Sequence, residues 1–261
     1  MRVSTLIIGS ALLLSGASFA APTTPPPAQA GYLPPGTYDA IKVLAPAPRP
    51  GSPVAEADRQ VFLATRALKD TPRWSLARSD DSTTGILQDF SCALGFTPSM
   101  STTPKMVGIM LRLRFDIRPA VDGPKDHYKR PRPYLVDEGA ICIDRSDGLD
   151  KSPDYPSGHS TWGWAIGTVL AQASPNQAAE IMARARTYGE SRMVCGVHNA
   201  SSVTAGQVNG AALMAAVNGS PLFRSDLEAL RAEIAAARKA GPAPDRTACA
   251  AEAALIAQPL L

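Results

Sequence analysis

Apolar residues recur at three- and four-residue spacing through most of this chain, and runs of alternating β-branched residues are nearly absent. The first spacing keeps side chains on one face of an α-helix, whereas alternation would indicate half-buried strands. One example runs from Val54 to Leu68, after Ser52 and Pro53, which suit an N-cap and a first helical position. The pattern predicts an all-α fold, a single-domain bundle of seven to nine helices with the active site between core helices.

The same spacing predicts the other helices of this bundle. The remaining helices are predicted over residues 85–94, from Pro104 toward Ile117, over 157–173, after Pro175, over 202–217 and over 221–239. A Pro-rich crossing at 119–133 separates the second of these helices from the third. A chain of 261 residues with 45% hydrophobic content can bury one sizeable core. Residues 53–241 are therefore predicted to form one helical domain, followed by a C-terminal tail over 242–261.

The N-terminal region differs from the rest in composition. Residues 1–20 carry Arg2, an apolar run and Ser18-Phe19-Ala20, which together predict a cleaved signal peptide. A membrane anchor is the alternative, but the apolar run is shorter than the ~20 residues that span a bilayer. Residues 21–52 are Pro-rich and predict an extended or mobile arm. We expect an exported protein, periplasmic or secreted.

Charge and hydropathy exclude two classes of partner. The formal net charge is only +3, and basic residues do not form a run with interleaved aromatics, so nucleic acid is not an expected partner. The longest internal apolar stretches are interrupted by Gln172, Gln207 and Asn209, so no stable membrane insertion is expected.

Four cysteines in an exported chain favour two disulfides, with three connectivities open. We favour Cys142 with Cys195, because both lie close to the motifs described below, and hence Cys92 with Cys249. The chain has no Cys-x-x-Cys, and its Asp-rich stretch over 137–154 lacks the ligand spacing of an EF-hand. No metal site is predicted.

Two short motifs supply candidate phosphate contacts. In Pro156-Ser157-Gly158-His159, a helix start would direct free N–H groups and its positive dipole end at an anion, and His159 could protonate a leaving oxygen. Lys125 and Arg132, seven residues apart, would supply a point charge and a planar fork to the phosphate oxygens. Taken singly, each of these is a common surface feature.

The third motif is Ser191-Arg192, followed six residues later by His198. Arg192 adds a second fork, and a neutral His198 could attack phosphorus to give a phosphohistidine. Such a nucleophile needs its other ring nitrogen held, normally by a carboxylate. Because phosphoryl transfer spreads charge over equatorial oxygens, fixed cations and N–H donors can supply most of the catalysis. The set predicts a phosphoryl-transfer site.

These three motifs, in this order, resemble the tripartite signature of the type 2 phosphatidic acid phosphatase superfamily. Within it, Lys125-Asp126-His127-Tyr128 and the exported, soluble character are similar to the class A bacterial nonspecific acid phosphatases. The resemblance implies that Lys125, Arg132 and Arg192 bind phosphate, Ser157 and Gly158 cradle it, His159 is the general acid and His198 the nucleophile. It also implies an all-helical fold, metal-independent chemistry without a cofactor, a periplasmic location and often a homo-oligomer. The expected substrates are small-molecule phosphomonoesters of broad range.

One position departs from the family pattern. The family continues His-x3-Asp, whereas this chain places Ser202 where the orienting carboxylate belongs. A serine brings no charge to stabilise an imidazolium, so a loss on the order of 10² to 10⁴ in rate is conceivable. An alternative role for Ser202 is an N-cap before Val203. A carboxylate from elsewhere in the chain is a third alternative.

Three functions are consistent with these residues. The first is an acid phosphatase, and the second a phosphate-binding homologue weakened by Ser202. The third is a vanadate-dependent haloperoxidase, because vanadate fits the same cations and one histidine. The short chain argues against the haloperoxidase, and the missing membrane spans argue against a membrane lipid phosphatase.

Overall fold

A computed structural model describes residues 30–261. The predicted signal peptide and the first part of the Pro-rich arm lie outside the described residues. Within them the chain forms α-helices and contains no strand. The helices are α1 (Ala40–Val43), α2 (Pro53–Thr65), α3 (Pro72–Ser79), α4 (Ile86–Asp89), α5 (Ser91–Leu94), α6 (Pro104–Tyr128), α7 (Asp147–Lys151), α8 (Gly158–Ala173), α9 (Ala178–Val194), α10 (Ala200–Val217), α11 (Pro221–Ala240) and α12 (Arg246–Ala257). The all-α prediction is confirmed, although twelve helices exceed the seven to nine expected because several are single turns.

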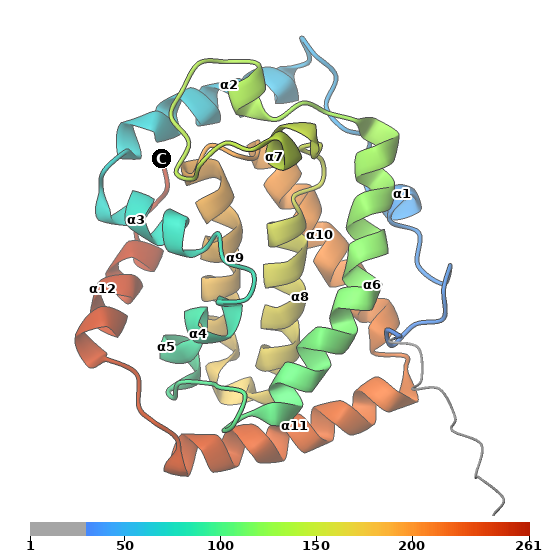
Figure 1. Cartoon of the computed structure of the whole chain (residues 1–261), viewed down its shortest axis with the longest axis vertical. Coiled ribbons are helices and arrows are strands. Elements are labelled where there is room, and N and C mark those ends of the chain that lie inside the picture. The colour runs from blue at the N-terminus through green and yellow to red at the C-terminus, as the bar shows by residue number, and fades with distance from the viewer. Residues whose placement is uncertain (1–29) are drawn as a thin grey trace, which may run out of the picture.

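The centre of the bundle is α8, which packs between α9 and α10, while α6 and α11 cover the same core (Figure 1). Two glycines allow this close packing. A Cβ on Gly163 would lie 2.5 Å from the Tyr188 ring of α9, and one on Gly206 would lie 2.5 Å from the Ser157 carbonyl. The second approach sets α10 directly against the start of α8, where the Ser-Gly-His motif lies.

The helix that begins at Pro104 is longer than predicted. It continues through Pro119 and Pro124 and ends at Tyr128, where Lys129 takes a left-handed conformation with φ 48°. A proline inside a helix removes one hydrogen bond, but burial of the neighbouring side chains in the core offsets that cost. Lys125 consequently lies in the last turn of α6 and not on a Pro-rich turn.

The N-terminal arm, predicted to be extended or mobile, is anchored to the helical domain from residue 30 onward. The backbone N–H groups of Tyr32 and Leu33 donate to the buried carboxylate of Asp116 at 2.7 and 3.0 Å. The Tyr32 hydroxyl donates to Asp226 at 2.9 Å, and Leu44 is buried in the core. Partners more than 80 residues away make these contacts, so local composition carried no signal of them.

The C-terminal tail also differs from expectation, because it contains α12. Its Cys249 forms a disulfide with Cys92, and Cys142 pairs with Cys195, so both favoured pairings are confirmed. None of the side chains of α12 is buried, although Glu252 contacts Arg184 of α9 at 3.1 Å. The disulfide is thus the main attachment of this helix. Across the described residues, none of the helices combines the length and the hydropathy needed to cross a bilayer.

We expect the Cys92→Ser/Cys249→Ser double variant to lose about 2–5 kcal/mol of unfolding free energy, because the bridge spans a sequence separation of 157 residues. Urea unfolding measures this loss, and limited proteolysis should show α12 cut first. The matched control is Leu222→Gln, an exposed change on α11 that should leave the midpoint in place. An unchanged midpoint in the cysteine variant would mean that α12 is held by its surface contacts alone.

Candidate active site

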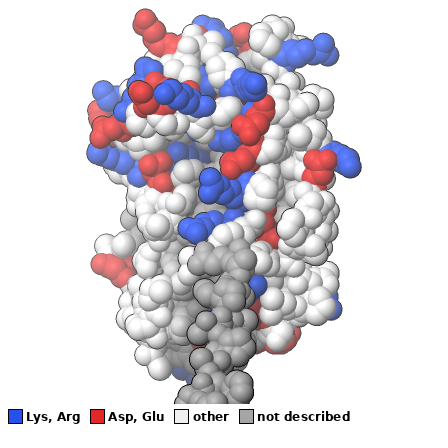
Figure 2. Space-filling model, turned by 45° about the vertical axis from the view of Figure 1, so that its right-hand side comes forward, with Lys and Arg blue, Asp and Glu red and all other residues white. Residues whose placement is uncertain are grey.

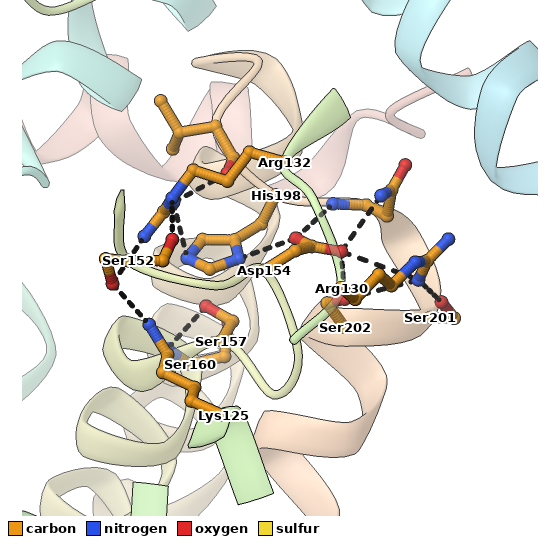
Figure 3. Close-up of polar contacts among 12 residues, drawn as sticks. Lys125, Arg130, Arg132, Ser152, Asp154, Ser157, Ser160, His198, Ser201 and Ser202 are labelled. Carbon is orange, nitrogen blue, oxygen red and sulfur yellow. Dashed lines mark hydrogen bonds and ion pairs between the residues drawn. The ribbon is translucent and has the colours of Figure 1, made fainter. Parts of the chain in front are cut away.

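The predicted site residues come from four places in the fold and meet at one end of the central helices. Lys125 lies in the last turn of α6, Ser157 caps α8 and Gly158 begins it, Arg192 lies in the last turn of α9, and His198 follows that helix. Lys125, Ser157 and His198 can be followed in Figure 3. An open pocket of about 680 Å³ lies here, lined among others by Arg132, His159, Arg192 and His198. The sequence motifs therefore build one site. The described residues contain no group of three or more His, Cys, Asp or Glu side chains that could hold a metal ion.

Lys125 and Arg132 are held together through Ser152, a residue that the sequence analysis missed. Lys125 Nζ donates to Ser152 Oγ at 3.0 Å, and Arg132 donates to the Ser152 carbonyl at 2.7 Å and to its hydroxyl at 3.3 Å. Arg132 Nη1 also donates to the Val197 carbonyl at 2.7 Å. Both cations are almost fully buried, so their fields are little screened by water.

Arg192 is the cation with the most unused hydrogen-bonding capacity. Its side chain is 2% exposed, and Nη2 contacts Asp81 at 2.8 Å. Within the described residues, Nε and Nη1 have no hydrogen-bond partner. A buried guanidinium with free N–H groups is costly unless an anion completes it. This geometry suits the binding of a phosphate group.

The start of α8 adds neutral donors. Ser157 is the N-cap of this helix, and its hydroxyl oxygen accepts from the N–H and the hydroxyl of Ser160 at 3.3 and 2.9 Å. The hydroxyl hydrogen of Ser157 is then left for another acceptor. Since α8 has 16 residues, the free N–H groups of its first turn and its dipole favour an anion beside Gly158.

His198 is paired with Asp154, which the sequence analysis did not identify. His198 Nδ1 lies 2.9 Å from Asp154 Oδ1, and Nε2 lies 3.1 Å from Arg132 Nη1 (Figure 3). Because a guanidinium can only donate, Nε2 must be the unprotonated nitrogen and Nδ1 must carry the proton. Burial and the neighbouring Arg132 and Lys125 lower the pKa of His198 well below its ordinary value, so the ring is neutral. This is the tautomer that a nucleophilic Nε2 requires.

Asp154 is held as an acceptor by its surroundings. Oδ1 also accepts from the Asn199 backbone N–H at 3.2 Å, while Oδ2 accepts from the Asn199 side chain at 2.9 Å and from Ser202 at 2.5 Å. Burial raises the pKa of Asp154, and the donors Ser202, Arg130 and Asn199 oppose that rise. With donors on both oxygens, a carboxylate fits this position better than a carboxylic acid.

The structure shows the third alternative, a carboxylate from elsewhere in the chain, beside His198. Ser202 itself has a role other than those first considered for its side chain. It does not contact His198 directly but donates to the carboxylate that does. It is not an N-cap either, because Asn199 occupies that position of α10 and Ser202 lies in the first turn. The missing family aspartate is thus offset by Asp154, and the reason for expecting a weakened phosphate-binding homologue no longer holds.

His159 faces the same pocket from the first turn of α8. Its Nε2 lies 2.9 Å from the Asp81 carbonyl oxygen, which can only accept, so Nε2 carries a proton and Nδ1 is left for the substrate. Burial and Arg192 lower the pKa of His159 well below its ordinary value. Asp81 therefore positions two residues. The Asp81 carbonyl contacts His159, and the Asp81 carboxylate contacts Arg192.

Asp154, Asp81 and Ser152 were missed because their roles depend on long-range contacts. Asp154 lies 44 residues before the histidine that it contacts. A weak signal did exist, since Asp154 stands two residues before Pro156 at the end of an Asp-rich stretch. Asp81 lies more than 100 residues from Arg192, in a segment without any motif.

The positive charge of the site is buried and is not part of a uniformly basic surface. On the face shown in Figure 2, lysines and arginines are interspersed with aspartates and glutamates. By contrast, Lys125, Arg132 and Arg192 are each at most 9% exposed. Three buried cations and two histidines directed at one pocket form an arrangement that suits phosphoryl transfer.

Comparison with known proteins specifies the family. The family model of the PAP2 superfamily matches residues 109–224. An acid phosphatase of Zymomonas mobilis is 36% identical over 220 residues, 82% of this chain and 82% of that protein. Non-specific acid phosphatases of Salmonella typhimurium and Providencia stuartii are 31% and 29% identical, over 73% and 77% of this chain and 78% and 83% of theirs.

The chain therefore belongs to the PAP2 superfamily, as a class A-like acid phosphatase. It is a phosphoric monoester hydrolase acting on small-molecule phosphoesters. The resemblance drawn from the three motifs is confirmed.

Lys125 makes phosphate binding at the site dependent on pH. Burial and the neighbouring Arg132 lower the pKa of Lys125 to about 8, so it is charged below that pH and loses its charge above it. We expect the inhibition constant of inorganic phosphate to rise above pH 8 by up to tenfold per pH unit, as this cation is lost. Competition assays between pH 5 and 9.5 measure it.

The matched variant for this prediction is Lys125→Arg, because an arginine stays charged throughout this range. The effect of phosphate's own protonation cancels in the ratio of the two inhibition constants, variant to unaltered protein, because both proteins are measured against the same phosphate at each pH. That ratio should change only above pH 8. A ratio independent of pH would show that Lys125 is not the titrating group.

Proposed function

We propose that this acid phosphatase is an exported, periplasmic enzyme that hydrolyses a broad range of phosphomonoesters through a phosphohistidine at His198. The observation that carries the proposal is the tautomer of His198. Asp154 accepts a hydrogen bond from the N–H group at Nδ1, so Nε2 keeps its lone pair. Nε2 lies among the phosphate-binding cations, next to Arg132. A histidine held in this way is prepared for attack on phosphorus.

In the first step, Nε2 of His198 attacks phosphorus and the bond from phosphorus to the ester oxygen breaks. Protonated His159 gives a proton from Nδ1 to the departing oxygen, so that an alcohol leaves. Lys125, Arg132 and Arg192 stabilise the charge on the three equatorial oxygens, with the hydroxyl of Ser157 and the N–H group of Gly158. Asp154 stabilises the phosphorylated ring, which now carries positive charge.

In the second step, water attacks phosphorus from the side that the alcohol left. His159, now neutral, takes a proton from this water, and the bond between phosphorus and Nε2 breaks. Inorganic phosphate leaves, His198 is again neutral and His159 is again protonated. The cycle consumes one water for each ester and needs no metal or redox group.

An acidic optimum follows from His159. Its pKa is lowered by burial and by Arg192, so in the free enzyme it is neutral near pH 7. The negative charges of a bound phosphate oppose Arg192 and raise that pKa again. The protonated acid is therefore populated best at low pH with substrate bound, and kcat should fall as pH rises.

The proposed location and substrate range have separate support. Two disulfides join all four cysteines, an arrangement typical of oxidising compartments. The charged residues of the site recognise the phosphate group alone, which favours a broad range of alcohols.

The experiment is phosphate release from p-nitrophenyl phosphate between pH 4 and 8, with a chelator present. A rapid acid-free quench after mixing with phosphorus-labelled substrate should trap label on the protein, stable to base and lost in acid, as expected for a phosphohistidine. Turnover without any trapped label, even when water attack is slowed at low temperature, would favour direct attack by water and contradict the covalent step.

A further inference from the structure

A second, mainly apolar groove lies beside the phosphate pocket. It has a volume of about 530 Å³, with α6 as its floor and α4, the segment before it and the first turn of α8 as its walls. The apolar side chains that line it include Leu87, Met110, Leu111, Ile117, Val121 and Trp162. Leu111 is 53% exposed, and Met100 at the far end is 70% exposed, so no part of the described chain covers them.

The groove adjoins the phosphate pocket. Gly158, which begins α8 in the phosphate cradle, also lines the groove. Thr83 lines both the groove and the phosphate pocket. His159, the residue that protonates the leaving oxygen in the proposed mechanism, directly follows Gly158. The groove therefore reaches the start of α8, next to the residue that protonates the leaving oxygen in the proposed mechanism.

The register of α6 sets the direction of this groove. Val121, Arg114 and Leu111 precede Lys125 by four, eleven and fourteen residues, so they share one face of the helix. At 1.5 Å per residue, Leu111 lies roughly 21 Å along the axis from Lys125. Leu111 and Val121, with Arg114 between them, thus lie on the face of α6 that ends at a phosphate-binding cation. A molecule whose phosphate contacts Lys125 can lay an extended apolar part along this floor.

We propose that this groove is the subsite for the leaving group, and that it selects phosphomonoesters of alcohols with an extended hydrocarbon part. The inference rests on the proposed function and names its preferred substrate class. Each methylene that enters an apolar groove raises binding by about fourfold. Because the groove holds the leaving group before and during transfer, that gain appears in kcat/KM.

The test is a series of n-alkyl phosphates from ethyl to dodecyl, kept below their aggregation concentrations. In the unaltered protein, kcat/KM should rise by about fourfold per methylene until the chain fills the groove. In Leu111→Gln the rise should stop at a shorter chain, with dodecyl phosphate at least tenfold poorer and ethyl phosphate unchanged. The matched control, Leu222→Gln, alters an equally exposed leucine on α11 outside the groove and should follow the unaltered series.

The same series titrated by calorimetry onto His198→Ala tests the groove without turnover. A dissociation constant that falls with chain length supports the groove, whether or not the unaltered protein forms a phosphohistidine. A flat series in both assays, or identical series for Leu111→Gln and the unaltered protein, would overturn the proposal. Failure of the unaltered protein to hydrolyse even ethyl phosphate would instead contradict the proposed function.

Discussion

Replacement of His198 by alanine should lower kcat by a factor on the order of 10⁴ to 10⁶, because it removes the nucleophile around which the site is arranged. The cations that bind phosphate remain in place, so phosphate should still bind. Steady-state release from p-nitrophenyl phosphate measures the rate, and calorimetric titration with phosphate measures the binding.

The matched control for this prediction is His127→Ala, which removes the histidine that does not line the site pocket. It should keep kcat within about a factor of two to three, as expected for a change outside the reacting groups. Persistent turnover in His198→Ala, at more than a hundredth of the original rate, would mean that another group or water attacks phosphorus.

Replacement of Asp154 by asparagine should lower kcat on the order of 10² to 10⁴, a range whose upper end is the loss for the same change in a serine protease triad. An asparagine amide can donate to Nδ1, which would move the ring proton to Nε2 and block the nucleophile. Phosphate binding should change little. The expected signature is a fall in kcat with a nearly constant KM, measured over several pH values to exclude a simple shift of the optimum.

The companion variants of this prediction exploit Ser202. Because Ser202 Oγ lies 2.5 Å from Asp154, Ser202→Asp alone would set two carboxylates side by side and should lower activity at neutral pH. This outcome is opposite to the gain that the family pattern alone would suggest. In the double variant Asp154→Ser/Ser202→Asp, the carboxylate returns to the family position, and kcat should exceed that of Asp154→Ser. A double variant no better than Asp154→Ser would show that only position 154 can orient the ring.

Helix ends were predictable wherever the signal is local. The predicted helices over 157–173 and 221–239 correspond to α8 (Gly158–Ala173) and α11 (Pro221–Ala240). Ser157 and Ser220 cap these helices with their own side chains, so the start is encoded within a few residues. The continuation of α6 through two prolines was not predictable, because burial of that face depends on helices far along the chain.

The residues of the site also fall into two groups, those with a local signal in the sequence and those without one. Lys125, Arg132, His159, Arg192 and His198 could be assigned from the sequence, because each lies in a motif with a fixed spacing and a chemistry specific to phosphate. Asp154, Asp81 and Ser152 could not, since each acts through partners 20 to 111 residues away. Ser202 looked like a loss of function until Asp154 was found beside it.

By itself, the sequence predicted an all-helical fold, two disulfides and a phosphate site built from cations and histidines, because apolar period, cysteine number and motif spacing act over short stretches of chain. Only the tertiary structure decided which carboxylate contacts His198, which ring nitrogen of each histidine is hydrogen-bonded to the protein, and that an apolar groove lies beside the phosphate pocket. These depend on the close approach of α6, α8 and α10, which the packing of the whole core sets.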